Sequence, residues 1–284
     1  MIGSFIDSWS LFHDAYLSGW LIAVLLAMVG VVVVARDQIF IGAAVAQSSV
    51  LGVTVAMALG SSSILDHCDG CRSDWFYILA GSLFAVAGAL FTSGSRIEGE
   101  SHEAITGWVF LVGSSLSVLI VAQSPHGLAE VHRLLASTII GATQTDLVVF
   151  AVLCALTALA LALLHRPLRL LTMDPELAGA LGLRVSLWNR LLSVWLGLSV
   201  GLSIHVSGVT YTFGALVLPA LIAKNVCAEV RQMFVAAPLI AVGLALPAFA
   251  LANAYDFPPA HVAVALWAGA LLPAWAARSR LAGR

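Results

Sequence analysis

Residues 191–223 read LLSVWLGLSVGLSIHVSGVTYTFGALVLPALIA and contain no Asp, Glu, Lys or Arg. A membrane-spanning helix needs about 20 apolar residues, so this run is long for one crossing and short for two. Its centre, SIHVSGVTYTFG, is interrupted by His205, Ser207 and Gly208. The number of times that this run crosses a membrane decides the direction of every helix that follows it.

The composition of the whole chain excludes a soluble protein. Of 284 residues, 61% are hydrophobic and only 10% are charged, whereas about 25% are charged in a typical soluble domain. The mean hydropathy is +1.00, and so few charges cannot cover the surface of a water-soluble chain. The net charge of −2 indicates no nucleic-acid partner. A cytosolic enzyme, a nucleic-acid binder and a disordered chain are excluded, and a polytopic membrane protein remains.

Uncharged runs long enough to cross a bilayer as helices recur along the chain. They are residues 15–35, 38–65, 75–95, 104–129, 147–165, 191–223, 232–255 and 257–277. None of these runs alternates apolar and polar residues, so we do not expect an outer-membrane β-barrel. The N-terminus lacks the basic region and cleavage site of a removable signal, so we expect the first run to stay in the membrane. The sequence predicts an all-α bundle of eight or nine transmembrane helices, a single domain over residues 1–284.

Basic residues favour nine crossings. If residues 191–223 cross twice and the N-terminus lies outside, 11 of the 13 basic residues lie inside. These are Arg36, Arg96, Arg166, Arg169, Arg184, Arg190, Lys224, Arg231, Arg278, Arg280 and Arg284. With one crossing the split becomes 6 inside and 7 outside. The positive-inside rule therefore predicts two crossings and a cytoplasmic C-terminus.

Small residues recur at helical spacing within the spans. Ser193, Gly197 and Gly201 follow one another at intervals of four, and Gly81 and Gly88 share one side of another span. This spacing allows two helices to approach closely in a membrane. We expect these positions to be helix contacts.

The longest cytoplasmic loop, residues 165–190, contains a short helix with its own end signals. Asp174 is a typical N-cap, Pro175 follows at the first helical position, and Glu176 lies in the first turn. Gly182 is placed as the C-terminal cap. A helix of about two turns is marginal alone in water. It either lies on the membrane surface or docks a cytoplasmic subunit, and the spacing alone supports both.

This loop resembles a known family. The segment TMDPELAGALGLRVSLWNRLL is similar to the coupling-helix region of the membrane permeases of ABC importers for zinc, manganese and iron. The resemblance continues in HVSGVTYTFGALVLPALIAKNVC and in YDFPPAHVAVAL. Upstream, ESHEAITGWVFLVGSSLSVLI and LLASTIIGATQTDL resemble the regions around the fourth and fifth spans. The matches occur in the family's order and cover most of residues 17–272.

The resemblance implies a half-channel in a bacterial cytoplasmic membrane. A second permease subunit, identical or related, would complete the path for a transition-metal cation, and an external metal-binding protein would deliver the cargo. Two cytoplasmic ATPases would dock on coupling residues Asp174, Pro175, Glu176, Ala178 and Gly182. The chain has no G-x-x-x-x-G-K-[ST] motif, so ATP would be bound and hydrolysed by the partner. We expect no cofactor bound by this chain itself.

The second predicted span departs from the family pattern. Members of this family carry an Asp and, four residues later, a His on one helical face, where both can reach one cation. In DQIFIGAAVAQSSVLGV those two positions hold Ala43 and Gln47, and Ala46 replaces a Ser. Gln47 and Ser48 offer only neutral oxygens, which hold a hard cation weakly. The partner subunit supplies the ligands, or the cargo differs, or other groups serve transit.

Two further groups of residues are candidates for function. The predicted outer loop LDHCDGCRSDW contains His67, Cys68 and Cys71, which form either a soft-metal clamp or a disulfide-stapled turn. His205 lies near the centre of the long uncharged run, where an ionisable group is a candidate for function or for helix packing. Cys154 and Cys227 are expected to be packing residues.

Other functions fit the sequence less well. An importer for a metal chelate such as haem, a siderophore or cobalamin is the nearest alternative, because a bulky neutral cargo needs no cation ligands in the path. A proton-coupled secondary carrier or an intramembrane enzyme would need carboxylates or paired catalytic groups inside spans. No Asp or Glu lies inside any predicted span.

Overall fold

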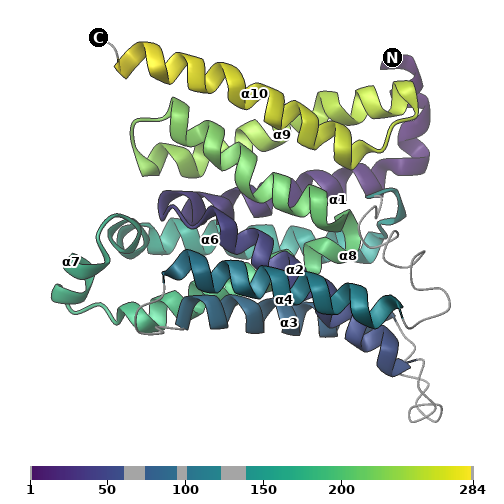
Figure 1. Cartoon of the computed structure of the whole chain (residues 1–284). Helices are drawn as coiled ribbons and strands as arrows, with labels where there is room; N and C mark the ends of the chain where they lie inside the picture. Colours follow the sequence, from purple (N-terminus) through teal and green to yellow (C-terminus); the bar gives the residue numbers. More distant parts are fainter. Residues whose placement is uncertain (1, 61–73, 95–100, 123–138, 283–284) are drawn as a thin grey trace. The chain divides into compact units, whose positions relative to one another are not determined.

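The computed structural model describes residues 2–60, 74–94, 101–122 and 139–282, and all regular elements within these ranges are helical (Figure 1). In chain order they are α1 (Ile2–Ala35), α2 (Ile39–Gly60), α3 (Asp74–Gly94), α4 (His102–Ala122), the 3₁₀ turn η2 (Ile139–Gly141), α6 (Gln144–Met173), α7 (Pro175–Ala180), α8 (Val185–Val226), α9 (Val230–Tyr255) and α10 (Pro259–Ala282). Eight of these helices are long and apolar enough to cross a membrane. The expected all-α transmembrane architecture is confirmed.

The contacts group the chain into two compact units. The first unit comprises Met1–Ile39, Thr138–Val185 and Thr210–Arg284, and the second comprises Phe40–Ser137 and Ser186–Val209. One border between the units falls within α8, between Val209 and Thr210. The preceding residue, Gly208, has a non-helical backbone with φ 75° and ψ 169°. This region is essentially restricted to glycine. The 42-residue α8 is therefore two helices joined at Gly208.

In the second unit, α2 and α3 pack through glycines and run antiparallel. Gly52 of α2 lies against Ala80 of α3, whereas Gly88 of α3 lies against Ser48 of α2. At successive contacts the residue numbers decrease along α2 as they increase along α3, so the two helices run in opposite directions. The missing side chains allow the two backbones to approach closely, as expected for helices in a membrane.

The first half of α8 packs on α3 in the same way. Gly197 faces the backbone of Val86, and Gly201 faces Ser82, so this half of α8 also runs antiparallel to α3. A Cβ added at Gly197 would lie 2.6 Å from the Cα of Val86. The contact predicted from the spacing of small residues is confirmed at both positions.

In the first unit, the second half of α8 runs parallel to α1. The Tyr211 hydroxyl donates a hydrogen bond of 2.8 Å to the carbonyl of Gly19, and 13 residues later Lys224 Nζ donates to the carbonyl of Val34 at 3.4 Å. Each crossing reverses the chain, so α1 and α3, the first and third helices, cross the membrane in the same direction. The first half of α8 runs antiparallel to α3, and the second half runs parallel to α1. The contacts within each unit therefore agree with the two crossings of α8 that the sequence predicts.

Three large aromatic side chains fill the centre of the first unit: Tyr211, Phe249 and Trp267 are fully buried. The centroids of the Tyr211 and Trp267 rings are 5.3 Å apart. Trp267 Nε1 donates to the carbonyl of Ala241 at 3.2 Å, and Tyr211 bonds Gly19 as described. Both polar atoms are thus satisfied, which matters because an unpaired polar group in hydrocarbon costs several kcal/mol.

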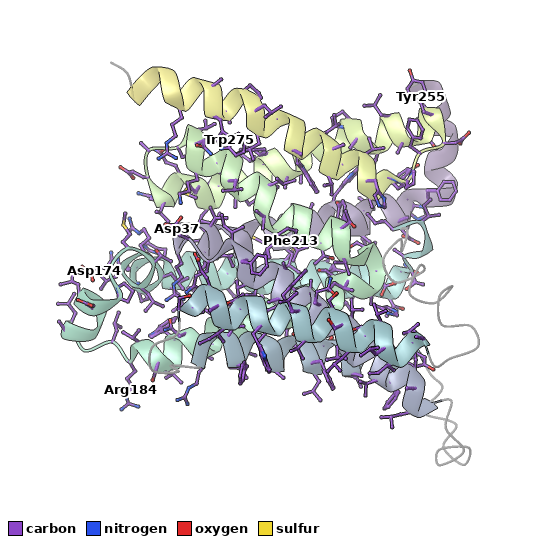
Figure 2. All side chains as sticks on the ribbon, in the orientation of Figure 1. Asp37, Asp174, Arg184, Phe213, Tyr255 and Trp275 are labelled. Carbon is purple, nitrogen blue, oxygen red and sulfur yellow. The ribbon has the colours of Figure 1, made fainter. Side chains whose placement is uncertain are left out.

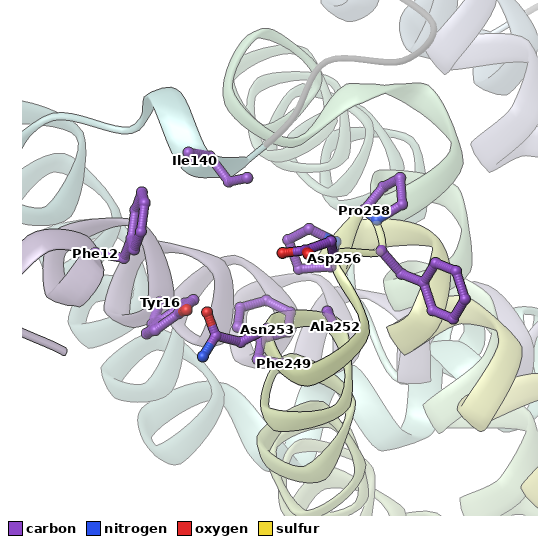
Figure 3. A pocket seen from close by; sticks show the side chains of 10 residues that line it. Phe12, Tyr16, Ile140, Phe249, Ala252, Asn253, Asp256 and Pro258 are labelled. Carbon is purple, nitrogen blue, oxygen red and sulfur yellow. The ribbon is translucent and has the colours of Figure 1, made fainter. Parts of the chain in front are cut away.

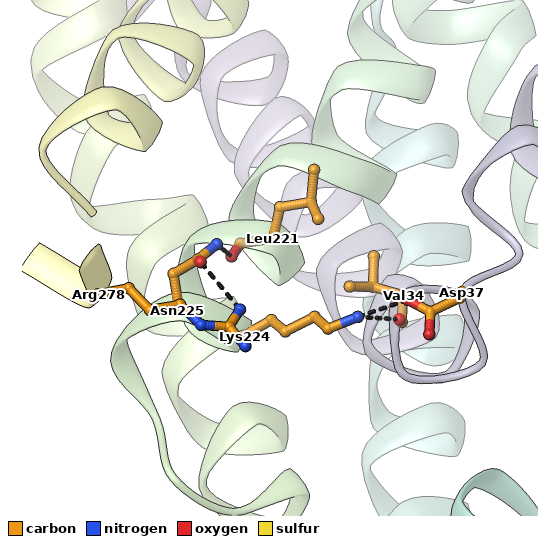
Figure 4. A network of polar contacts seen from close by, with 6 residues as sticks. All are labelled: Val34, Asp37, Leu221, Lys224, Asn225 and Arg278. Carbon is orange, nitrogen blue, oxygen red and sulfur yellow. Dashed lines mark hydrogen bonds and ion pairs between the residues drawn. The ribbon is translucent and has the colours of Figure 1, made fainter. Parts of the chain in front are cut away.

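Polar contacts join three helix ends of the first unit at one side (Figure 4). Lys224 Nζ lies 2.5 Å from Asp37 Oδ1, directly after the end of α1. Arg278 Nη1 of α10 donates to Asn225 Oδ1 at 3.2 Å. Such exposed contacts contribute only about 0–1 kcal/mol each. They place the ends of α1, α8 and α10 together, as the predicted cytoplasmic side requires.

The close contact at Gly197 predicts a large effect from one added methyl group. We expect Gly197→Ala to lower the midpoint of thermal unfolding, because overpacking costs about 1–3 kcal/mol. Gly243 in α9 is the matched control, since an added Cβ meets nothing within 4 Å among the described residues. Gly243→Ala should leave the midpoint unchanged or raise it, since Ala favours helix. Equal midpoints for both variants, measured by circular dichroism in detergent, would contradict this packing.

The reversal at Gly208 predicts a specific pattern of labelling. In a background that lacks the four native cysteines, a cysteine at Thr210 should react with a membrane-impermeant thiol reagent added outside intact cells. A cysteine at Ala228 should react only after the membrane is opened, and a reporter fused after Arg284 should read cytoplasmic. Labelling of Thr210 only from inside would show that α8 crosses once.

Candidate functional site

The short helix α7 is built as the sequence predicts. Asp174 Oδ1 accepts a hydrogen bond of 2.9 Å from the backbone N–H of Leu177, and Pro175 opens the helix. At the other end Gly182 adopts φ 86°, and the N–H of Leu183 donates to the carbonyl of Ala178 at 3.1 Å. Both ends are therefore closed by local hydrogen bonds. The predicted caps at Asp174 and Gly182 are confirmed.

Apolar side chains are open in and around α7. Met173 at the end of α6, Leu177 within α7 and Leu181 directly after it are 72%, 48% and 66% exposed. Figure 2 shows Asp174 and Arg184 at one edge of the chain. We refer to Met173, Leu177 and Leu181 as the α7 docking surface. This surface lies outside the predicted spans and beside charged residues, where exposed apolar side chains are typical of a protein contact.

Ala178 does not belong to the α7 docking surface. Its side chain is 0% exposed, so it holds α7 against the rest of the first unit and cannot meet a partner directly. The sequence reasoning chose Ala178 and missed Met173, Leu177 and Leu181. Their apolar character was visible in the sequence, but which side chains around α7 are exposed depends on packing.

The positions that would carry metal ligands in α2 share one half-exposed face. Ala43 and Gln47 are half-buried, as are Leu51 and Val55 further along the same stripe. The residues between them are buried. A Cβ on Gly113 of α4 would lie 3.1 Å from the backbone of Gln47, so α4 approaches α2 closely at this level. Gln47 supplies the single polar side chain among these four positions.

Ser48 lies on a different side of α2. Its side chain is buried, and its hydroxyl donates a hydrogen bond of 3.0 Å to the carbonyl of Ala44. Gly88 of α3 faces it closely. Ser48 is therefore a packing residue at the contact of α2 with α3 and does not join Gln47 on the half-exposed face.

His205 and Gln47 belong to different helices. His205 lies on α8, four residues after Gly201, and is half-buried. Gln47 lies on α2, where Gly113 of α4 approaches it.

Within the described ranges, no group of three or more His, Cys, Asp or Glu side chains is close enough to hold a metal ion. The predicted clamp of His67, Cys68 and Cys71 lies outside the described residues. Cys154 is buried in α6 with its Sγ 3.1 Å from the carbonyl of Leu21, which agrees with a packing role. Beyond the end of α8, partial burial raises the pKa of the Cys227 thiol, which makes it a poor nucleophile at neutral pH.

The described part of the chain is all-helical, with eight helices long and apolar enough to span a membrane and a capped helix between two of them. This is the architecture of a transporter membrane subunit. Residues 8–278 match the ABC 3 transport family, and the chain therefore belongs to this family. It is a multi-pass membrane protein of the bacterial type, and the fold and family expected from the sequence are confirmed.

Several relatives are similar along most of their length. A metal transport system membrane protein of Thermotoga maritima is 25% identical, covering 93% of this chain and 92% of the relative. The manganese transport system membrane protein MntC of Halalkalibacterium halodurans is 22% identical, covering 88% and 81%. The manganese import system permease protein ScaB of Streptococcus parasanguinis is 25% identical, covering 78% and 75%.

Two solved structures share the fold. PsaBC from Streptococcus pneumoniae, in complex with Fab, superposes with a TM-score of 0.80 at 17% identity, covering 97% of this chain and 95% of the other. An inward-facing ABC transporter of the metal-chelate type superposes with a TM-score of 0.73 at 19% identity, covering 92% and 86%. At these identities the likeness concerns the fold.

Proposed function

We propose that this chain is the permease subunit of an ATP-binding-cassette importer for a transition-metal cation, with manganese the first candidate and zinc or iron the next. The α7 docking surface carries this proposal. It is an open apolar surface on a helix fixed at both ends, in a chain that belongs to an ABC transport family. Such a surface suits a cytoplasmic ATPase, which would bind the ATP that this chain has no motif to hold.

Manganese is the first candidate because two relatives of this chain are named as manganese transport proteins. The metal is cargo, and no resident cofactor is needed by this chain. A second permease subunit would complete the path, and an external metal-binding protein would supply the cation. The half-exposed stripe at Ala43 and Gln47 is the surface of α2 that a second subunit could face.

We further propose that the path is formed by two different permease subunits, and that this chain is the one poor in ligands. Ala43 and Gln47 replace the carboxylate and imidazole expected there. A carboxylate–imidazole pair on the partner subunit alone would bind a divalent cation weakly enough to release it, which transit requires. Two copies of this chain would offer only the amide oxygens of Gln47.

A metal chelate is the second candidate cargo. A path without carboxylate or imidazole suits a bulky ligand whose metal is already coordinated, and one transporter of the same fold is of the metal-chelate type. A proton-coupled carrier is less well supported, because no Asp or Glu lies within the core of any described span.

The α7 docking surface predicts the effect of one charge. We expect Leu181→Asp to abolish transport and ATPase co-purification with unchanged membrane insertion, because a charge cannot be desolvated cheaply in an apolar contact. Leu181→Met is the matched control and should behave as the wild type. Ala178→Arg should instead lower the yield of folded protein, since Ala178 is buried. A well-inserted Leu181→Asp protein with normal transport would remove α7 from the mechanism.

The ligand-poor stripe predicts a gain of metal binding. A homodimer of this chain with its ATPase should bind manganese and zinc poorly, because neutral amide oxygens are weak ligands for either ion. The double change Ala43→Asp with Gln47→His should add a site, retain metal after gel filtration and slow transport. The control Val55→Asp with Leu59→His places the same pair on the stripe at other positions. Ordinary transport by the homodimer, unchanged by the restored pair, would contradict the hetero-dimeric path and favour a chelate.

A further inference from the structure

A cavity of about 330 Å³ opens in the first unit, at the end of α1 opposite Asp37. It lies among α1, η2 and the turn between α9 and α10, and its walls include Phe12, Tyr16, Ile140 and Phe249. The topology places this end of α1 on the outer side of the membrane. The volume falls within the range of small-molecule sites, about 300–1,000 Å³.

Four of the ten residues that line the cavity are aromatic: Phe12, Tyr16, Phe249 and Phe257. The centroids of Tyr16 and Phe249 are 5.7 Å apart, and those of Phe12 and Tyr16 are 6.2 Å apart. Tyr16 and Phe249 are buried. They are therefore fixed within the protein, unlike the aromatic side chains that anchor a helix in the membrane interface by pointing outward. A cavity with fixed aromatic walls offers several ring faces to one ligand.

A carboxylate completes the site. Asp256 ends α9 in the left-handed conformation, with φ 53° and ψ 36°. Figure 3 shows its carboxylate, together with the side chain of Asn253, directed toward the space bounded by Phe12 and Tyr16. Among the described residues no basic side chain lines this cavity. Within the described part of the cavity, no basic group balances the carboxylate of Asp256.

This combination selects a class of ligand. Ring faces attract cations, and the attraction grows when the cation is partly desolvated. A divalent metal ion would need several oxygen ligands, and one carboxylate with one amide does not supply them. An organic ammonium group carries a single positive charge, which one carboxylate can balance, and carbon atoms that can lie against the rings.

We propose that this outer cavity binds an organic ammonium group, of the kind carried by phospholipid headgroups and by small amines such as choline and ethanolamine. Phe12, Tyr16 and Phe249 supply the ring faces, and Asp256 supplies the counter-charge. The site lies at the level of the outer headgroups, because the turn between α9 and α10 is at the outer end of both helices. It goes beyond the proposed import of metal and does not depend on it.

The test compares charged and uncharged ligands of one shape. Choline, ethanolamine and the uncharged choline isostere 3,3-dimethyl-1-butanol are titrated against the purified complex, and the midpoint of thermal unfolding is followed. Choline and ethanolamine should raise the midpoint, whereas the isostere should not. Equal stabilisation by choline and its isostere would overturn the proposal, since the cavity would then be an apolar slot.

Variants connect the effect to the site. Asp256→Asn keeps a residue that tolerates the left-handed backbone, and Phe12→Leu keeps the apolar wall but removes the ring. Each should weaken choline binding by roughly five- to tenfold, the loss of one such interaction. Asp14→Asn removes a neighbouring carboxylate on α1 that does not line the cavity, and should leave the affinity unchanged. Equal affinity in Asp256→Asn and wild type would overturn the proposal.

Nanodiscs distinguish the two sources of the ammonium group. A higher midpoint in phosphatidylethanolamine with phosphatidylglycerol than in phosphatidylglycerol alone, lost in Asp256→Asn, would identify the lipid headgroup. Stabilisation only by free choline or ethanolamine in detergent, also lost in Asp256→Asn, would identify a small amine. Failure of every ammonium ligand to raise the midpoint would overturn the proposal without bearing on metal transport.

Discussion

The non-helical backbone of Gly208, between the two halves of α8, is the constraint on which the predicted topology depends. A residue with a Cβ would be strained at φ 75° and ψ 169°, so the uncharged run of α8 can turn back only where glycine stands. The turn brings Lys224 to Asp37, at the same side as the end of α1. With a single crossing by α8, every helix after Gly208 would be inverted together. One residue without a side chain thus sets the direction of the helices that follow it.

Backbone approach at glycines has a second consequence. Contacts such as Gly197 with Val86 and Gly30 with the carbonyl of Leu216 bring helix backbones together without intervening side chains. In the most apolar stretches of α1, α2 and α8, 78%, 67% and 72% of the residues are buried, whereas in that of α6 only 17% are buried. Lipid tails are as apolar as leucine, so association relies on this close packing.

Local features such as helix ends were predictable from the sequence, whereas the side chains that each helix exposes were not. The ends of α7 follow from Asp174 and Gly182 because each cap is a hydrogen bond or a backbone angle within a few residues. The two crossings follow from charge, because basic residues stay on one side. By contrast, the sequence predicts Ala178 as a contact residue, but its side chain is buried, whereas that of Leu181, three residues later, is exposed. The outer cavity was also missed, because Phe12, Ile140 and Phe249 come from three distant segments.

Hydroxyl groups in the second unit explain why the candidate path is so poor in ligands. Ser48, Ser203 and Ser207 each donate to the carbonyl four residues earlier on their own helix. A buried hydroxyl in hydrocarbon needs such a partner, and once bonded inside a helix contact it is no longer directed toward a passing ion. The polar composition of these spans therefore overstates the polarity of any surface they present.

On the half-exposed stripe of α2 this leaves Gln47, an amide that can donate and accept but carries no charge. Because a bare divalent ion gives up its hydration shell only for strong ligands, such a stripe favours a cation that remains partly coordinated by other groups during transit. Those groups belong either to a second subunit or to the cargo itself, and this is why a ligand-bearing partner and a chelated metal are the two readings that the site supports.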